Sequence, residues 1–370
     1  MKGEYSMELL EIFEKLHSIP EISWEEKNTT EYIEAFLKEH DIYVERFTDH
    51  TGLIAEVGSG KPVVGIRADI NALFQELNGK MQANHSCGHD AHMTIAIGVL
   101  LNLKRIETSL QGTVRCLFQP AEEQGNGSLS VVKTGFVDDM DYLFGVHLRP
   151  KDELEIGKAA PSLRHGAAIF YKGKIIGDDA HGARPQCTVN AIDIGMALNS
   201  YINQLSLSPM LPHSIKMTRF SAGSKNPNII PGSAEFSLDL RAQTNHGLTS
   251  LKELAQKKLD SIETLYGVKI EGSWIDYTPG AEVSREAEEI LSAAIREIRG
   301  EENLAEPITT PGSDDFHFYT IERTNLKAAM LALGADLTPG LHHPSMTFDQ
   351  SCLLHGVDIL TDAVKRALNQ

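Results

Sequence analysis

The amino-acid sequence predicts an α/β fold: a largely parallel sheet covered by helices, with a ferredoxin-like α+β domain inserted into it. Three observations predict this fold. The chain has 370 residues, which is enough for about two hydrophobic cores. Its first part alternates short β-branched runs with helical stretches, and residues 165–276 show a βαββαβ order. We therefore expect a large domain formed by residues 1–164 and 277–370, with the inserted domain between them.

The large domain is expected to begin with two amphipathic helices. Apolar residues recur at helical spacing at Leu9, Leu10, Phe13 and Leu16, and again at Ile33, Phe36 and Leu37. Strand-like runs follow: GLIAEV near 52, PVVGIRA from 62, TVRCLFQ from 113 and DYLFGVH from 141, with helical stretches near 91–106 and 127–134. This alternation is typical of a parallel sheet with helices on its faces.

The inserted domain is predicted from its order of elements. A strand (AAIFYKGK) and a helix (VNAIDIGMALNSYINQL) precede two strands (SIKMTRFS and AEFSLDLRA), a second helix and a last strand (VKIEGSW). Beyond it, helices are expected near 284–298 and 349–368. Between them lies the apolar run KAAMLALGA, which we expect to return to the first sheet as a strand.

The amino-acid composition excludes several classes of binding partner. Lys and Arg total 34 against 51 for Asp and Glu, and the net charge of −17 argues against binding to nucleic acid or anionic membranes. Neither a signal-peptide core nor a run of ~20 apolar residues is found, so a soluble, cytoplasmic protein is expected. The four cysteines lie far apart without a CxxC pair, which argues against a disulfide framework or a zinc ribbon. A small-molecule ligand fits these features best.

The densest group of chemically active residues is HSCGHDAH (85–92), at the expected start of a helix. Imidazole and thiolate bind borderline divalent metals, and Cys87 and His89 are spaced so that both can face one site from an irregular loop. In the alternative interpretation the histidines cap a helix and Cys87 fills the core. The density of the cluster favours a metal site.

Two adjacent carboxylates, Glu122 and Glu123, follow the strand-like run that ends at FQP. Ligands bind at the carboxyl ends of strands in open α/β sheets. One glutamate can then hold a metal while the other acts as a general base. His147 closes another strand-like run, and His342 and His343 supply two further imidazoles before the last helix. Taken singly, each of these residues is more often structural or solvated, and only their combination indicates a site.

Seven motifs occur in an order known from one family. The sequence resembles the acylamino-acid amidohydrolases, di-metal peptidase-like enzymes that include aminoacylases, hippurate hydrolases, indole-acetyl-amino-acid hydrolases and N-acetyl-diaminopimelate deacetylases. The resemblance covers nearly the whole chain. It rests on GIRADINAL (65–73), HSCGHDAH (85–92), FQPAEE (118–123), GVHLRP (145–150), AHGARP (180–185), NIIP (228–231) and LHHP (341–344).

The resemblance implies a pair of divalent cations with the Cys87 thiolate as a bridging ligand. The implied ligands are Cys87, His89, Glu123, His147 and His342. His342 is preferred to His343 because the family's ligand stands two residues before the proline. Glu122 is the implied general base and acid, and Asp69 is implied to orient a metal ligand. Manganese or zinc is preferred, with cobalt or nickel as alternatives.

The resemblance also assigns roles to the inserted domain, as a lid and as the contact of a homodimer. His181 matches a histidine that reaches the partner subunit's active site and stabilises the developing oxyanion. Asn228 and Arg241 match substrate-binding positions, and the planar fork of Arg241 suits a carboxylate. Whether His181 acts in its own subunit or across the dimer stays open.

Several positions depart from the family's common pattern. Asn71 stands where Asp is usual, Phe74 and Gln75 stand where Pro-Ile is usual, and Gln350 replaces a frequent acid. None of them is an implied ligand or the base. These departures bear on substrate preference, and the lost charges bear on metal affinity.

The sequence thus predicts a metal-dependent amidohydrolase that cleaves the amide bond of N-acyl amino acids by attack of metal-activated water. One alternative is a dipeptidase or carboxypeptidase with the same metals, which would prefer substrates with a free terminal amine. A remote alternative is a binding protein on the same scaffold, without hydrolytic activity.

Overall fold

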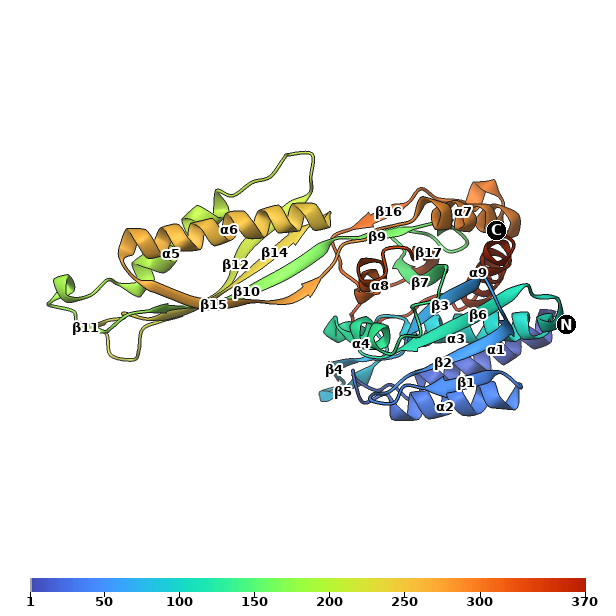
Figure 1. Cartoon of the computed structure of the whole chain (residues 1–370). Helices are drawn as coiled ribbons and strands as arrows, with labels where there is room; N and C mark the ends of the chain where they lie inside the picture. The colour runs from blue at the N-terminus through green and yellow to red at the C-terminus, as the bar shows by residue number, and fades with distance from the viewer. Residues whose placement is uncertain (1) are drawn as a thin grey trace. The chain divides into compact units, whose positions relative to one another are not determined.

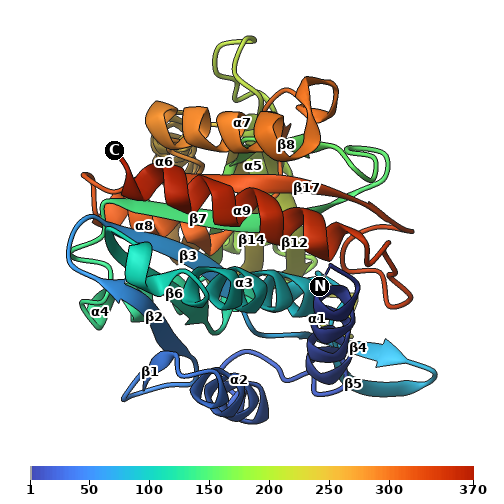
Figure 2. The same ribbon diagram turned by 90° about the vertical axis from the view of Figure 1, so that its right-hand side faces the viewer.

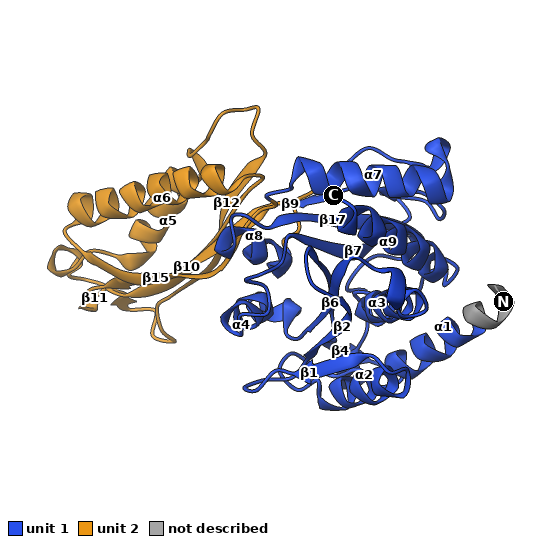
Figure 3. Cartoon of the chain, turned by 45° about the vertical axis from the view of Figure 1, so that its right-hand side comes forward, with its two compact units in different colours: residues 1–164, 282–309, 314–370 blue, residues 165–281, 310–313 orange. Residues whose placement is uncertain are grey.

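The computed structural model describes residues 2–370 (Figure 1). The chain divides into two compact units (Figure 3). Unit 1 comprises the residues up to 164 together with 282–309 and 314–370, and unit 2 comprises 165–281 and 310–313. Unit 2 thus runs past residue 276 at its end, because β15 reaches Thr278 and the amide of Ala281 still donates to the carbonyl of His165.

Unit 1 is built on a seven-stranded sheet of order β1-β2-β6-β3-β7-β17-β8. Its parallel centre consists of β3 (Val63–Asp69), β6 (Gly112–Gln119), β7 (Tyr142–Pro150) and β17 (Lys327–Leu337). The outer strands β1 (Tyr43–Arg46), β2 (Leu53–Ser59) and β8 (Ala159–Ala160) are antiparallel to their neighbours. The expected α/β class is confirmed, and KAAMLALGA does return to the first sheet as β17.

Helices cover both faces of this sheet (Figure 2). On one face the core contains apolar residues of α1 (Lys2–His17), α2 (Lys27–Glu39), α3 (His89–Lys104), α7 (Arg285–Arg299) and α9 (Cys352–Leu368). On the other face α4 (Gly127–Lys133) and α8 (Phe318–Glu322) pack against the sheet. Because both faces are covered, the central strands are almost continuously buried.

A hairpin of β4 (Leu73–Leu77) and β5 (Lys80–Asn84) lies within unit 1, between β3 and α3 in the sequence. Its two-residue turn is Asn78-Gly79, and both residues have positive φ, at 53° and 78°. Such a turn matches the right-handed twist of paired strands, which is why Asn-Gly is favoured there. Gln75 pairs with Gln82 across this hairpin.

Unit 2 has the expected ferredoxin-like order. The four-stranded antiparallel sheet has the order β12-β14-β10-β15. Its elements are β10 (Ala167–Ile176), α5 (Ala191–Asn203), β12 (His213–Ala222), β14 (Ala234–Ala242), α6 (Asn245–Tyr266) and β15 (Lys269–Thr278). Asn190 and Thr244 cap the two helices by accepting hydrogen bonds from backbone N–H groups.

Short strands complete the fold. β11 (Ala180–His181) pairs with β13 (Ile229–Ile230) in unit 2, and β9 (Leu163–His165) pairs with β16 (Ile308–Thr310). Among the described residues, no helix has the length and apolar character that crossing a bilayer requires.

Candidate metal centre

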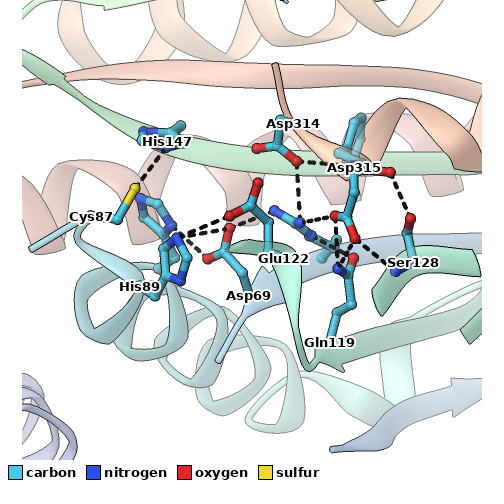
Figure 4. A network of polar contacts seen from close by, with 12 residues as sticks. Asp69, Cys87, His89, Gln119, Glu122, Ser128, His147, Asp314 and Asp315 are labelled. Carbon is cyan, nitrogen blue, oxygen red and sulfur yellow. Dashed lines mark hydrogen bonds and ion pairs between the residues drawn. The ribbon is translucent and has the colours of Figure 1, made fainter. Parts of the chain in front are cut away.

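The predicted ligands and the predicted base of unit 1 meet at the carboxyl edge of the parallel strands. Glu122 and Glu123 follow the end of β6, and His147 lies in β7. Cys87 and His89 lie at the start of α3, where Gly88 adopts a left-handed conformation with φ 86°. His342 comes from the loop between β17 and α9. Segments that are far apart in the sequence thus supply one site (Figure 4).

Cys87 lies between two groups of ligand atoms. Its Sγ atom is 3.8 Å from Nε2 of His147. Cys87 also forms a cluster with Glu123 and His342, whose ligand atoms all lie within 4.8 Å of one another. The Cys87 side chain thus lies near three other predicted ligands, His147, Glu123 and His342.

The two buried imidazoles present the nitrogen that a metal needs. Nδ1 of His89 lies 2.7 Å from the carbonyl oxygen of Asn71, and Nδ1 of His147 lies 2.8 Å from the carbonyl oxygen of Leu148. A carbonyl only accepts, so Nδ1 of each ring is the donor and Nε2 keeps its lone pair. Nε2 of His89 and Oε1 of Glu123 are buried without a hydrogen-bond partner. Orphaned acceptors of this kind fit a site for divalent cations.

Asp69 is buried beside these predicted ligands. Its Oδ1 atom lies 2.7 Å from Nδ1 of His92, and its Oδ2 atom lies 3.6 Å from Nε2 of His89. Nε2 of His92 in turn accepts a hydrogen bond from the amide of Leu148 at 3.1 Å. Both ring nitrogens of His92 are therefore engaged, and this histidine supports the site without facing a cation.

The charges around Glu122 make its carboxylate a strong proton acceptor. Burial raises its pKa well above the usual range, and Asp314, Glu123 and Asp315 raise it further against the opposing effect of Arg67. Burial also raises the pKa of the Cys87 thiol, together with the charges of Glu123 and Glu122. Bound cations act in the opposite sense and favour the thiolate.

Beneath the site lies a buried ion network that the sequence interpretation missed. The Arg67 guanidinium, 1% exposed, donates to Asp69 at 2.6 Å, to Asp315 at 2.8 Å and to Asp314 at 3.2 Å. Gln119 accepts from Arg67 at 2.9 Å and donates to Asp315 at 2.8 Å (Figure 4). An arginine within an apolar strand signals a buried ion pair, but two of its three carboxylate partners, Asp314 and Asp315, are far away in the sequence.

The residues predicted in the inserted domain all lie in unit 2. His181 pairs with Ile229 in the β11–β13 sheet, and its exposed ring accepts a hydrogen bond from the amide of Ala183 at 3.0 Å. The carbonyl of Asn228 accepts from the amide of Gly182 at 2.7 Å, so Asn228 lies next to the His181 segment.

Arg241 lies in β14, in the four-stranded sheet of unit 2 rather than in the β11–β13 pair. It pairs with Ala168 at the start of β10, whereas His181 follows the end of that strand. Nε of Arg241 is 3.0 Å from Oδ1 of Asp239. The side chain lines a cavity of about 210 Å³ together with Ser214 and Gln243.

Comparisons with known proteins identify the family of this chain. The model of "Peptidase family M20/M25/M40" matches residues 65–366. The chain is 27% identical to N-acetyl-L-cysteine deacetylase of Bacillus subtilis, over 98% of this chain and 88% of that protein. It is 30% identical to IAA-amino acid hydrolase ILR1-like 4 of Arabidopsis thaliana, over 82% of this chain and 72% of that protein.

Two solved structures show the same fold over the whole chain. A dinuclear metal-binding peptidase of the M20 family from Bacillus subtilis aligns with a TM-score of 0.85 at 26% identity, covering 99% of both chains. A putative aminohydrolase from methicillin-resistant Staphylococcus aureus aligns with a TM-score of 0.90 at 26% identity, covering 99% of this chain and 97% of the other. The resemblance found in the sequence is confirmed: the chain belongs to the peptidase family M20/M25/M40, as a metal-dependent amidohydrolase.

Proposed function

We propose that the protein hydrolyses the amide bond of N-acyl amino acids with the help of two divalent cations. The ligands that we propose are Cys87, His89, Glu123, His147 and His342. The observation that carries the proposal is the convergence of thiolate, imidazole and carboxylate donors around Cys87, next to a second carboxylate that is free for proton transfer. Relatives named for N-acetylcysteine, IAA-amino acids and p-aminobenzoyl-glutamate all act on an amino acid whose nitrogen carries an acyl group.

In this mechanism Glu122 moves the protons. The cations, when bound, polarise the amide carbonyl and lower the pKa of water. The carboxylate of Glu122, 11% exposed and 3.7 Å from Nε2 of His89, takes the proton of the attacking water. Glu122 then delivers that proton to the leaving nitrogen. The raised pKa of this carboxyl group suits both steps, because it takes a proton readily and still returns it to an amine.

The types of donor atom favour some divalent cations over others. Mixed thiolate, imidazole and carboxylate ligation suits borderline ions, so we propose Mn²⁺ or Zn²⁺, with Co²⁺ and Ni²⁺ as alternatives. All five donors are side chains of unit 1, so cation binding requires no residue of unit 2.

We further propose that the protein is a homodimer and that His181 serves the site of the partner subunit. Arg241 and His181 lie at opposite ends of β10, and the seven-residue step from Ala168 to Ile175 alone spans roughly 23 Å. One small substrate cannot reach both residues of the same subunit, so two subunits would share them. The edge strand β12 and helix α5 offer exposed apolar side chains for such contact, including Met196 at 68% and Phe220 at 37% exposure.

For Arg241 we propose that its guanidinium holds the carboxylate of the substrate. The side chain is 39% exposed beside a cavity and is held by Asp239, which orients the planar fork. A charge-assisted, bidentate hydrogen bond then distinguishes an acid from its amide. Asn228, next to the His181 segment, is proposed to contact the substrate from the partner subunit.

The alternative is a carboxypeptidase or dipeptidase with the same cations. It is favoured by one observation, the 27% identity to thermostable carboxypeptidase 1 of Saccharolobus solfataricus over 83% of this chain. A free amino group in the best substrate distinguishes this function from the first, because an N-acyl amino acid lacks that group.

A substrate screen tests the proposal. Chelated protein is reloaded with each of the four metals and assayed on N-acyl amino acids, on their carboxamides and on dipeptides with a free amine. We expect no activity before reloading, cleavage of N-acyl acids after it, and at least tenfold slower cleavage of the carboxamides. Full activity of rigorously metal-free protein, or a preference for free dipeptides, would contradict the proposal.

A further inference from the structure

The β4–β5 hairpin carries a polar side chain directed at the loop of a proposed metal ligand. Gln75, in β4, stands at a position where the resembled family usually has an apolar residue. Its Nε2 atom donates a hydrogen bond to the carbonyl oxygen of His342 at 2.7 Å. Residues 75 and 342 belong to unit 1, so this contact lies within one compact unit.

The same amide group also contacts the segment that carries Cys87. Oε1 of Gln75 accepts hydrogen bonds from Oγ of Ser86 at 2.8 Å and from Nδ2 of Asn84 at 3.2 Å. Ser86 is 1% exposed and directly precedes Cys87. One side-chain amide therefore joins the backbone segments of two proposed ligands of the same cation cluster.

The backbone of His342 requires such support. Its φ of 63° lies in the left-handed region that residues other than glycine rarely adopt, and such a conformation persists only where the surroundings hold it. The amide of His342 donates to the carbonyl of Ser86 at 2.7 Å, and Nδ2 of Asn84 donates to the carbonyl of Pro344 at 3.1 Å. With Gln75, these bonds fix both sides of the His342 peptide.

Packing contributes little at this point. The side chain of His342 is 53% exposed, whereas that of Glu123, its neighbour in the site, is 13% exposed. A ligand on an exposed loop loses conformational freedom when it binds a cation, and a loop that is already fixed loses less. An apolar side chain at position 75 offers no donor for the carbonyl of His342.

From these contacts we propose that Gln75 is a positioning residue. It holds the loop of His342, whose backbone is left-handed, in the conformation that binds a cation, and thereby raises the affinity of the site for the cation that His342 binds. The proposal rests on the metal site proposed above, and it adds a residue of this chain that acts through the backbone. Removing the side-chain amide of Gln75 should make the loop more mobile and weaken the binding of one of the two cations. The cation held mainly by the buried ligands should bind with unchanged affinity.

The test uses Gln75→Met, which keeps the length of the side chain but removes its hydrogen bonds. Gln82→Met is the matched control, because Gln82 is the exposed cross-strand partner of Gln75 in the same hairpin. Hydrogen exchange of residues 341–345 is measured in the full-length, metal-free protein. Binding of the two Mn²⁺ ions is measured by calorimetric titration.

We expect Gln75→Met to exchange faster at residues 341–345 and to bind one of the two Mn²⁺ ions about 10- to 100-fold more weakly, as is typical when a partner of a metal ligand is lost. Gln82→Met should match the wild type in both measurements. Wild-type exchange and two unchanged Mn²⁺ affinities in Gln75→Met would overturn the proposal.

A second variant covers the case in which Gln75→Met does not fold, and the hydrogen exchange of the metal-free protein separates this proposal from the proposed function. If Gln75→Met does not fold, Asn84→Ala replaces it, since Asn84 donates to both Gln75 and the carbonyl of Pro344. Faster exchange at residues 341–345 is then expected, and unchanged exchange overturns the proposal. A wild-type protein that binds no Mn²⁺ would instead contradict the proposed function, while the exchange of the metal-free protein would still show whether Gln75 holds the loop.

Discussion

Nε2 of His342 lies 3.3 Å from Oε1 of Glu123, although the two residues come from loops that follow different strands, β17 and β6. The neighbouring carboxylate of Glu123 raises the pKa of His342 above its ordinary value. Wherever His342 is protonated, a cation can bind its Nε2 atom only after that proton is lost. We therefore expect cation binding at His342 to depend on pH.

We predict that Mn²⁺ affinity falls as the pH is lowered from 8 through the raised pKa of His342, because the protonated ring has no lone pair to offer. Calorimetry in buffers of different ionisation enthalpy measures the protons released. His342→Gln should release fewer protons than the wild type at pH 6.5. His343→Gln, which changes the neighbouring exposed histidine, should behave as the wild type. Equal proton release by all three proteins would show that His342 does not bind the cation.

The two adjacent glutamates should respond differently to the same substitution. Glu122→Gln should keep both cations and lose about 10² to 10⁴ in turnover, because proton transfer is removed. Glu123→Gln should lose cation affinity, because the buried Oε1 atom of Glu123 makes no hydrogen bond and lies beside the ligand atoms of Cys87 and His342. Metal content and kcat of the purified variants decide between these roles, and the reverse pattern would exchange the assignments of base and ligand.

Cys87→Ser tests the thiolate between the two groups of ligands. A hydroxyl remains protonated at neutral pH and is a much poorer bridging donor than a thiolate. We expect the variant to fold, since serine is close in size to cysteine, and to bind Mn²⁺ more weakly than the wild type. Unchanged metal content together with an unchanged rate would remove Cys87 from the ligand set.

The Arg67 network should contribute to stability independently of the cations. Arg67→Met leaves the buried carboxylates of Asp69, Asp314 and Asp315 without the positive charge of the guanidinium. Breaking a buried ion pair of this kind typically lowers the free energy of unfolding by about 3–5 kcal/mol. Arg219→Met is the control, because its pair with Glu235 is solvent-exposed and should contribute at most about 1 kcal/mol. Urea unfolding of the metal-free proteins gives both values. A loss below about 1 kcal/mol in Arg67→Met would contradict this prediction.

Mixing two inactive variants tests whether subunits share a site. A heterodimer of His181→Ala and Glu122→Gln contains one site with an intact base and an intact His181 from the partner subunit. Random exchange should restore up to about a quarter of wild-type activity, since half of the dimers are mixed and each has one complete site. If exchange is demonstrated by mass spectrometry and activity stays absent, His181 acts in its own subunit or outside catalysis.

The fold class and the residue types of the proposed site can be predicted from the sequence alone. The βαββαβ order of the insertion, the return of KAAMLALGA to the first sheet and the placement of Glu122 after a strand all follow from local periodicity and from where strands end. These features depend on residues that are close together in the sequence, so the local pattern of apolar and polar residues is enough to predict them. The family resemblance then supplied the roles of residues that lie in separate motifs.

Which side chains face one another could be seen only in the three-dimensional structure. Within the histidine-rich motif, His92 is engaged by Asp69 and by the amide of Leu148, whereas Nε2 of His89 faces the carboxylates of the site. Two partners of Arg67, Asp314 and Asp315, also lie far away in the chain, as does the His342 carbonyl that accepts from Gln75. Such pairings arise when buried charges and amides must find partners during packing, and no local periodicity encodes which distant residue will meet that need.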